Sequence, residues 1–195
     1  LELSPYLQAL FSDVKNTGHK RAGAVNLYIR GSRSRSGLKS IPVSLLILDE
    51  VDEMTQDNIP LATERQSGQT HKETWMLSTP TIDDFGINNY FQQSTQEEFF
   101  FICPHCSRHI NLDFPESLDI EGDDPLFAKG FLKCKECDHR LDHEAKPEWL
   151  KDAYWEKTVQ NSIRGFHISQ LYSSTVSPNE IARSALHSET STAVE

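Results

Sequence analysis

Four cysteines are the residues of this 195-residue chain whose type and spacing point most directly to chemistry. They form two C-x-x-C pairs, Cys103/Cys106 and Cys134/Cys137, with 27 residues between the pairs. Two such pairs supply four thiolates for tetrahedral zinc, and a site closed by four protein ligands is structural because no position is left for water. Disulfides or a redox C-x-x-C are the alternatives. The chain lacks a signal-peptide pattern, which disfavours disulfides, and a redox motif needs no second matching pair.

The surroundings of the cysteines offer other ligands and a charged loop. His105, His109, His139 and His143 lie close in sequence, but four cysteines already complete the site, so we expect these histidines at the surface. Residues 113–124 hold six acids and no base, a composition that repels nucleic-acid phosphates. The acidic stretch therefore indicates docking on a basic protein surface, or only solubility.

Carboxylates follow the apolar run in "SLLILDEVDEM", residues 44–54. An apolar strand that ends in Asp and then Glu is the Walker B pattern. Asp49 would hold the Mg²⁺ that accompanies nucleotide phosphates, usually through water, and Glu50 would orient the attacking water. Buried strands often end in acids, so this pattern alone is a weak signal. Asp52 is a candidate to assist at the metal or an ordinary surface residue.

A second short strand is predicted in "TWMLSTPT", residues 74–81, stopped by Pro80. Its distance from the first strand leaves room for one helix between them. Ser78, Thr79 and Pro80 form a hydroxyl-bearing turn that could sense the γ-phosphate and couple its loss to motion. The alternative is a capped turn before the proline.

A basic loop precedes the carboxylates. Residues 1–40 carry seven Lys/Arg and two acids, a net charge of +5 within a chain of net charge −10. Arg30, Arg33, Arg35 and Lys39 surround a Gly/Ser-rich stretch that could contact DNA phosphates or a neighbouring subunit's nucleotide. A flexible, solvated loop is the alternative reading.

The pattern of the remaining residues predicts an α/β protein. We expect helices over residues 1–20, after Pro147 through residue 158, and over 179–187, with strands over 24–29, 43–48, 97–102 and 163–174. The run at 43–48 is continuously apolar, as in a parallel strand covered on both faces. No apolar run approaches the ~20 residues that span a bilayer.

Five motifs in order carry a family resemblance. "SLLILDEVDEM", "LSTPT", "CPHC", "CKEC" and "GFHISQLYS" together resemble the phage terminase large subunits of the lambda type, from about residue 26 to residue 185. The resemblance implies part of a P-loop (RecA-like, ASCE) ATPase sheet with an inserted zinc ribbon. It implies residues 1–95 as the later part of the ATPase core, 96–146 as the ribbon, and 147–195 as a return to the core or a linker to a nuclease domain.

That family packages viral double-stranded DNA into the procapsid with ATP and Mg²⁺. The resemblance implies homo-oligomers, a terminase small subunit and a portal as partners, and the host cytoplasm as the location. The phosphate-binding loop G-x-x-x-x-G-K-[ST] does not occur in the chain, so we expect a central fragment that alone neither hydrolyses ATP well nor cuts DNA. A helicase-like ATPase fragment, or a non-enzymatic zinc-ribbon module that binds DNA or protein, is the alternative.

Overall fold

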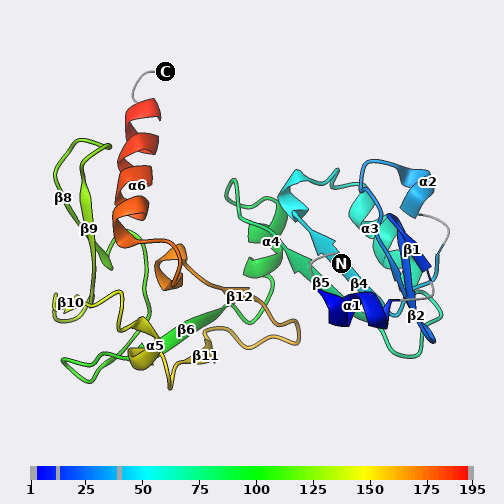
Figure 1. The fold of residues 1–195 in the computed structure, drawn as a ribbon, viewed down its shortest axis with the longest axis horizontal. Helices are drawn as coiled ribbons and strands as arrows, with labels where there is room; N and C mark the ends of the chain where they lie inside the picture. The colour runs from blue at the N-terminus through cyan, green and yellow to red at the C-terminus, as the bar shows by residue number, and fades with distance from the viewer. Residues whose placement is uncertain (1–3, 12–13, 39–40, 193–195) are drawn as a thin grey trace. The chain divides into compact units, whose positions relative to one another are not determined.

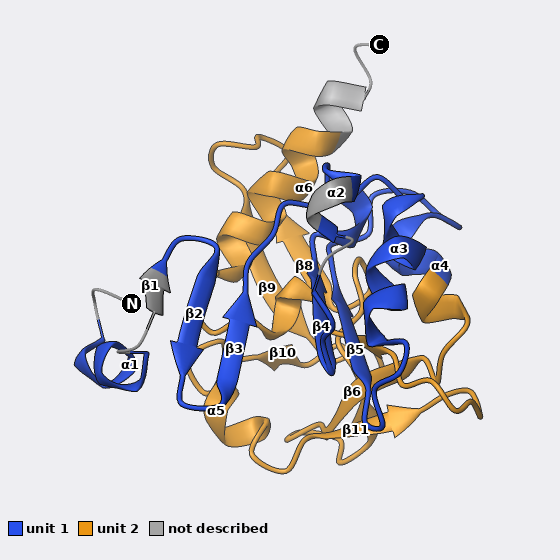
Figure 2. Ribbon diagram, turned by 90° about the vertical axis from the view of Figure 1, so that its right-hand side faces the viewer, with its two compact units in different colours: residues 1–89 blue, residues 90–195 orange. Residues whose placement is uncertain are grey.

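The chain forms two compact units, residues 1–89 and 90–195, in the computed structural model. The structure describes residues 4–11, 14–38 and 41–192. Figure 1 follows the chain from the blue N-terminal unit to the red C-terminal helix, and Figure 2 colours unit 1 blue and unit 2 orange. The three-part division into residues 1–95, 96–146 and 147–195 stays a prediction.

Unit 1 contains two small sheets. Strands β1, β2 and β3 form an antiparallel meander, and β4 pairs with β5 in parallel. Its elements are α1 (Pro5–Leu10), β1 (Val14–Asn16), β2 (His19–Ala22), β3 (Val25–Tyr28), α2 (Arg35–Leu38), β4 (Leu45–Asp49), the 3₁₀ turn η1 (Val51–Glu53), α3 (Asn58–Thr63), the 3₁₀ turn η2 (Glu64–Gln66), β5 (Glu73–Leu77) and the start of α4 (Gly86–Gln92).

The start of unit 1 differs from the expected single helix over residues 1–20. The helix α1 occupies only Pro5–Leu10, with the Ser4 hydroxyl accepting from the Leu7 N–H at its beginning. Gly18 and Gly23 permit the turns of the meander that follows, and β-pairing replaces the helix there. The Arg-rich loop was also expected to lack regular structure, but it contains the one-turn helix α2.

The parallel pair β4–β5 positions the candidate carboxylates. The crossover between the strands contains α3, as a parallel connection requires. At the starts of the strands, the buried Gln66 side chain donates to the carbonyls of Ser44 and Glu73, at 2.9 and 2.6 Å, and so joins them. Both strands therefore end at the same edge.

One face of this pair is open, so the expectation that residues 43–48 are covered on both faces is wrong for this chain. Leu48 is 5% exposed, but Leu45 and Ile47 are about half exposed, as are Trp75 and Leu77. The alternation of buried and exposed residues is that of a strand packed on one face. A continuously apolar strand can be buried on both faces, but the described residues cover only one face of the β4–β5 pair.

Unit 2 also contains two small sheets. The first has the order β11-β6-β12 with β7 paired to β6, and the second is the antiparallel sheet β10-β9-β8. Its elements are β6 (Glu97–Ile102), β7 (His109–Ile110), β8 (Leu118–Glu121), β9 (Lys129–Lys133), β10 (Arg140–Leu141), α5 (Lys146–Trp149), β11 (Tyr154–Lys157), β12 (Phe166–His167), the 3₁₀ turn η3 (Gln170–Tyr172) and α6 (Pro178–Thr192).

A single apolar core holds unit 2 together. Phe101 of β6 is fully buried and its ring lies 4.7 Å from the ring of Trp149 and 6.4 Å from that of Tyr172. The same core includes Leu132 of β9 and Ala182 of α6. Residues on either side of position 147 thus share one core in this unit.

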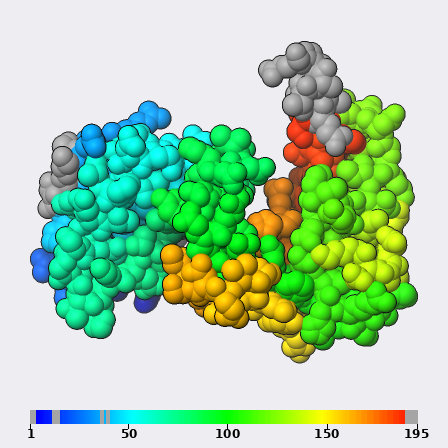
Figure 3. All heavy atoms as spheres, turned by 180° about the vertical axis from the view of Figure 1, so that it is seen from behind, coloured from blue at the N-terminus to red at the C-terminus, as the bar shows by residue number. Residues whose placement is uncertain are grey.

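The helix α6 packs against the hairpin β8–β9, where the views in Figures 1 and 3 also place it. A glycine is needed at this crossing, because a Cβ on Gly130 would lie 2.0 Å from the Pro178 carbonyl oxygen. The helix expected over residues 179–187 is confirmed within the longer α6.

The segment from Pro147 to Ser174 departs from expectation. The α-helix there is limited to α5, which ends at Trp149. Tyr154–Lys157 pairs antiparallel with β6 in place of a continuing helix. Trp149 and Trp155 therefore do not share a helical face. The strand expected over residues 163–174 reduces to Phe166–His167, followed by η3. Cross-strand aromatic contacts such as Phe99 with Trp155 favour the strand over the local helical propensity.

The protein is thus a mixed α/β chain of small sheets that carries a four-cysteine cluster. Its described residues include two parallel strands of unit 1, which are too few to identify a P-loop sheet. Within the described ranges, no helix has the length and apolar character needed to cross a bilayer.

Candidate metal centre and strand-end carboxylates

The four cysteines lie on two turns of the same backbone geometry. In the first turn, the Cys103 N–H donates to the Arg108 carbonyl and the Ser107 N–H donates to the Cys103 carbonyl, each at 2.9 Å. The second turn repeats these bonds between Cys134 and His139 at 3.0 Å, and between Asp138 and Cys134 at 2.9 Å. Ser107 and Asp138 hold equivalent left-handed conformations, with φ of 60° and 55°.

The two turns bring the sulfurs together. All four Sγ atoms lie within 4.8 Å of one another, and those of Cys106 and Cys134 are 3.8 Å apart. Tetrahedral zinc with Zn–S bonds of ~2.3 Å separates its sulfurs by about 3.8 Å. The donor set and its spacing therefore fit a structural zinc ion.

The surroundings of the thiols differ from one cysteine to the next. Burial raises the pKa of Cys134 to about 12, whereas the Arg108 backbone N–H holds the pKa of Cys106 below its usual value. A divalent cation overrides such differences, because a coordinating thiol is deprotonated outright.

His105 and His139 approach the cluster without being needed to complete it. Their rings stack in parallel with centroids 4.0 Å apart, and His105 Nδ1 lies 3.7 Å from the Cys137 sulfur. An imidazole N–H at this position would orient a thiolate from outside the ligand set.

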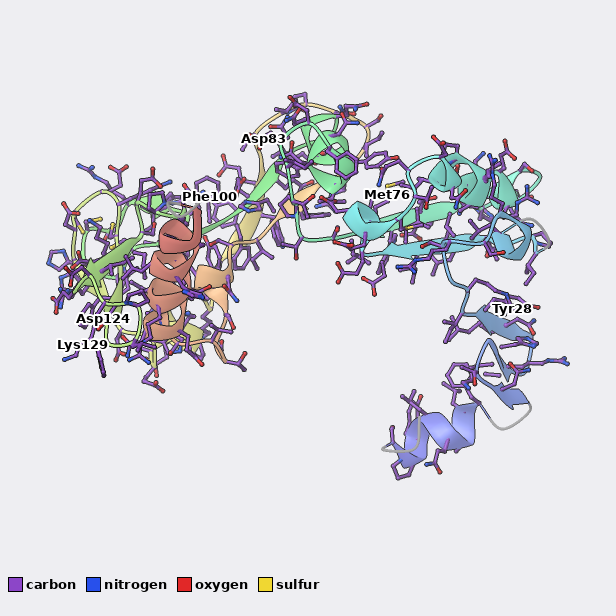
Figure 4. All side chains as sticks on the ribbon, turned by 90° about the horizontal axis from the view of Figure 1, so that it is seen from above. Tyr28, Met76, Asp83, Phe100, Asp124 and Lys129 are labelled. Atoms are coloured by element: carbon purple, nitrogen blue, oxygen red, sulfur yellow. The ribbon has the colours of Figure 1, made fainter. Side chains whose placement is uncertain are left out.

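The acidic stretch between the turns is partly neutralised by the sheet β10-β9-β8. Arg140 binds Asp119 and Glu121 at 2.8 and 2.5 Å, and Lys135 binds Asp113 at 2.6 Å. Figure 4 shows Asp124 and Lys129 at the loop end of the hairpin β8–β9. Half of the six acids thus have basic partners within the unit.

Asp49 is the last residue of β4, and its side chain is exposed at the strand end. Glu50 follows in the left-handed conformation, with φ and ψ both 55°. This conformation costs a non-glycine residue roughly 1–2 kcal/mol, and such outliers are a reason to suspect function. The left-handed backbone at Glu50 ends the alternation of side chains along β4.

Ser78, Thr79 and Pro80 lie beside the carboxylates in unit 1. Asp49 pairs with Leu77, so that Ser78 begins the segment that leaves β5 at the same edge of the sheet. The Ser78 hydroxyl accepts from the Asp52 N–H at 3.1 Å and donates to the Thr79 carbonyl at 3.3 Å.

A groove of about 390 Å³ runs beside the end of β4. Most of its lining residues are apolar, and Asp49, Arg30, Ser32 and Arg65 are among its polar ones. The guanidinium of Arg30 also donates to the Gly18 and Ile29 carbonyls. Two cationic side chains and one carboxylate thus border a largely apolar groove.

The other basic residues of the loop lie apart from the groove. Arg33 is exposed and Arg35 begins α2, and neither lines the groove. Lys39 lies outside the described residues. Arg30 is therefore the member of the predicted basic set that the structure brings near Asp49.

Two residues were given no firm role by the sequence and have specific contacts in the structure. Asp52 joins the end of β4 to the segment after β5 through four hydrogen bonds. The Tyr172 hydroxyl accepts from the Leu112 N–H, 2.7 Å away, in the segment after β7. The sequence signal for Asp52 was the repeated acidic pair of residues 49–53, and that for Tyr172 was its place in the motif "GFHISQLYS". Neither signal identifies a hydrogen-bonding partner.

Comparison with known proteins gives one match. Residues 1–155 match the model of the family described as "Phage terminase large subunit gpA, ATPase domain". No curated protein and no solved structure matches the chain. Because the match covers most of the chain and includes the carboxylates, the Ser-Thr-Pro turn and all four cysteines, this protein belongs to the phage terminase large subunit gpA family, in its ATPase domain.

Proposed function

We propose that this chain is part of the ATP-driven motor with which a phage terminase large subunit packages viral DNA into the procapsid. The observation that carries the proposal is the shared edge of β4 and β5, where Asp49, Glu50 and the Ser78–Thr79–Pro80 turn meet. Family membership supplies the chemical context for that edge.

In this proposal Asp49 holds the magnesium ion of the bound nucleotide, which would neutralise charge on the phosphates. Glu50 orients the attacking water and takes part in its deprotonation. Arg30 and Arg65 contact phosphate oxygens along the groove. The Ser78 hydroxyl, which accepts from the Asp52 N–H in η1, responds to the presence of the γ-phosphate.

The phosphate-cradling loop would come from sequence other than these residues, so we propose that the chain is a central part of a longer motor protein. Its partners would be double-stranded DNA, the terminase small subunit, the portal and further copies of itself, in the cytoplasm of the host bacterium. A structural zinc ion held by the four cysteines would stabilise the ribbon.

The test is ATP hydrolysis by the full-length polypeptide that contains this chain. We expect Glu50→Gln to lower kcat by about 10²–10⁴-fold, the usual contribution of a positioned base. Glu53→Gln is the matched control, because Glu53 is exposed in the same turn. Equal rates for wild type and Glu50→Gln would remove Glu50 from the mechanism.

A further inference from the structure

The carboxylate of Asp52 is the meeting point of three segments of unit 1. Its Oδ2 accepts from the Thr81 N–H and from the Thr81 hydroxyl, each at 2.9 Å. Its Oδ1 accepts from the Ile87 N–H at 2.7 Å. Three donors therefore converge on one side chain, two from Thr81 in the segment after β5 and one from Ile87 in the first turn of α4.

The backbone of Asp52 completes the connection, since its N–H donates to the Ser78 hydroxyl. Residue 52 lies in η1, three residues after the end of β4. The strand that ends in Asp49 is thus bonded through a single residue to positions 78, 81 and 87. Figure 4 places Met76 on β5 and Asp83 in the segment that follows it, the region that Asp52 holds.

The backbone facing Asp52 is shaped for its carboxylate. Gly86 has φ +50° and is buried, and a Cβ at this position would lie 2.3 Å from Oδ1 of Asp52. Any other residue would meet both the strained conformation and the carboxylate. The glycine therefore permits the close approach that brings the Ile87 N–H within 2.7 Å.

The electrostatics agree with an ionised acceptor. Partial burial acts to raise the pKa of Asp52, but the hydrogen bonds from Ile87 and Thr81 outweigh it and hold the pKa below its usual value. Both lone-pair positions of Oδ2 are used by Thr81. These bonds use three of the roughly four acceptor positions of the carboxylate, and a magnesium ion, one of the two readings of Asp52 from sequence, would share Oδ1 with the Ile87 N–H.

We propose that Asp52 is a positioning residue that couples the nucleotide end of β4 to the Ser78–Thr81 turn and to the first turn of α4. A shift of the Asp49–Glu50 backbone would carry Asp52 with it and pull on the Thr81 and Ile87 amides. Because α4 runs from Gly86 to Gln92, it is also the stretch of chain that connects unit 1 to unit 2.

The connection itself is tested by residue-resolved amide hydrogen exchange on the 195-residue chain. In Asp52→Asn the side chain keeps its shape but has one acceptor oxygen for three donors. We expect the Thr81 and Ile87 amides to exchange about 10–100-fold faster, as the loss of a bond to a charged acceptor implies. Glu53→Gln changes the neighbouring exposed carboxylate and should leave both amides at wild-type rates.

A milder variant guards against simple unfolding. Thr81→Val removes one hydroxyl donor and keeps the Ile87 bond, so we expect faster exchange at Thr81 and little change at Ile87. If Asp52→Asn leaves both amides unchanged, or if Glu53→Gln accelerates them equally, the proposed connection is wrong. This arm does not depend on ATP hydrolysis.

The coupling is tested in the full-length polypeptide, and this arm rests on the proposed function. We expect Asp52→Asn to lower kcat about tenfold or more while the KM for ATP changes less than about twofold, because Asp52 contacts the protein and not the nucleotide. An unchanged kcat in Asp52→Asn, with kcat abolished in Glu50→Gln, overturns the coupling and leaves the proposed function standing. Insensitivity to Glu50→Gln instead removes the proposed catalytic role of Glu50, and the exchange experiment still decides the connection.

Discussion

The hydroxyl of Tyr172 joins η3 to the part of unit 2 that carries the four cysteines. It accepts from the Leu112 N–H at 2.7 Å and donates to the Phe99 carbonyl. Leu112 is 1% exposed and Tyr172 is 8% exposed, so water does not replace either partner easily. Burial also raises the pKa of Tyr172. One oxygen atom thus joins β6, the segment after β7 and η3.

We expect Tyr172→Phe to destabilise unit 2 by about 1.5–4.5 kcal/mol. The Leu112 N–H loses its acceptor inside the core, a loss of about 1–3 kcal/mol, and the bond to the Phe99 carbonyl adds about 0.5–1.5 kcal/mol. The phenylalanine ring keeps the packing against Phe99 and Phe101. The substitution therefore isolates the hydrogen bonds from the apolar contacts.

The assay is urea unfolding followed by tryptophan fluorescence at saturating zinc. The chain has three tryptophans, and in a Trp75→Phe background the remaining Trp149 and Trp155 both report on unit 2. We expect the midpoint to fall by about 1–2 M urea for a slope of about 2 kcal/mol/M, which is within the usual range for small domains.

Tyr154→Phe is the matched control. Its hydroxyl contacts His109 and Glu156, but the side chain is 38% exposed, so water takes over the lost bonds. We expect a change below about 1 kcal/mol. If Tyr172→Phe unfolds at the midpoint of Tyr154→Phe, the buried hydroxyl contributes nothing specific and the reasoning fails.

Two further predictions concern unit 2. Metal analysis of the purified chain should give about one zinc per chain, and a chelator should unfold unit 2 while the amides of unit 1 keep their exchange rates; a folded, metal-free unit 2 would exclude a structural zinc. Arg164 holds the pKa of the buried Glu97 at about 2, from a usual value of 4.5. Because the folded-state pKa is lowered, this pair stabilises the protein above about pH 4.5, and the contribution is lost as the pH falls toward about 2. The difference in unfolding free energy between wild type and Glu97→Gln should therefore shrink across that range, and a constant difference would contradict the assignment.

The sequence motifs gave more reliable predictions than the secondary-structure patterns around them. The spacing of the cysteine pairs predicted a four-ligand site, and the structure brings the four sulfurs together. The resemblance to lambda-type terminases is confirmed by the family match. The roles of Asp49, Glu50 and the Ser-Thr-Pro turn remain predictions, although the structure places these residues at one edge of a sheet.

Several elements could not be predicted because their conformation depends on distant partners. The sequence around Tyr154 has helical periodicity. It nevertheless forms the strand β11, because β6 offers backbone hydrogen bonds and aromatic neighbours. The first 20 residues likewise divide between α1 and a meander whose pairing no local pattern reveals. Local propensity contributes less free energy than such tertiary contacts, so the contacts decide the conformation where the two disagree.

The sequence by itself determined the chemistry that spacing alone can specify. Two C-x-x-C turns form from local backbone bonds, and their order with the carboxylate and Ser-Thr-Pro motifs identified the family. The tertiary structure decided which side chains act on one another across the chain. Asp52 reaches Ile87 over 35 residues, and the Tyr172 hydroxyl reaches the Leu112 N–H over 60. Such pairs depend on the folding of intervening segments that share no local signal, so only the folded chain reveals them.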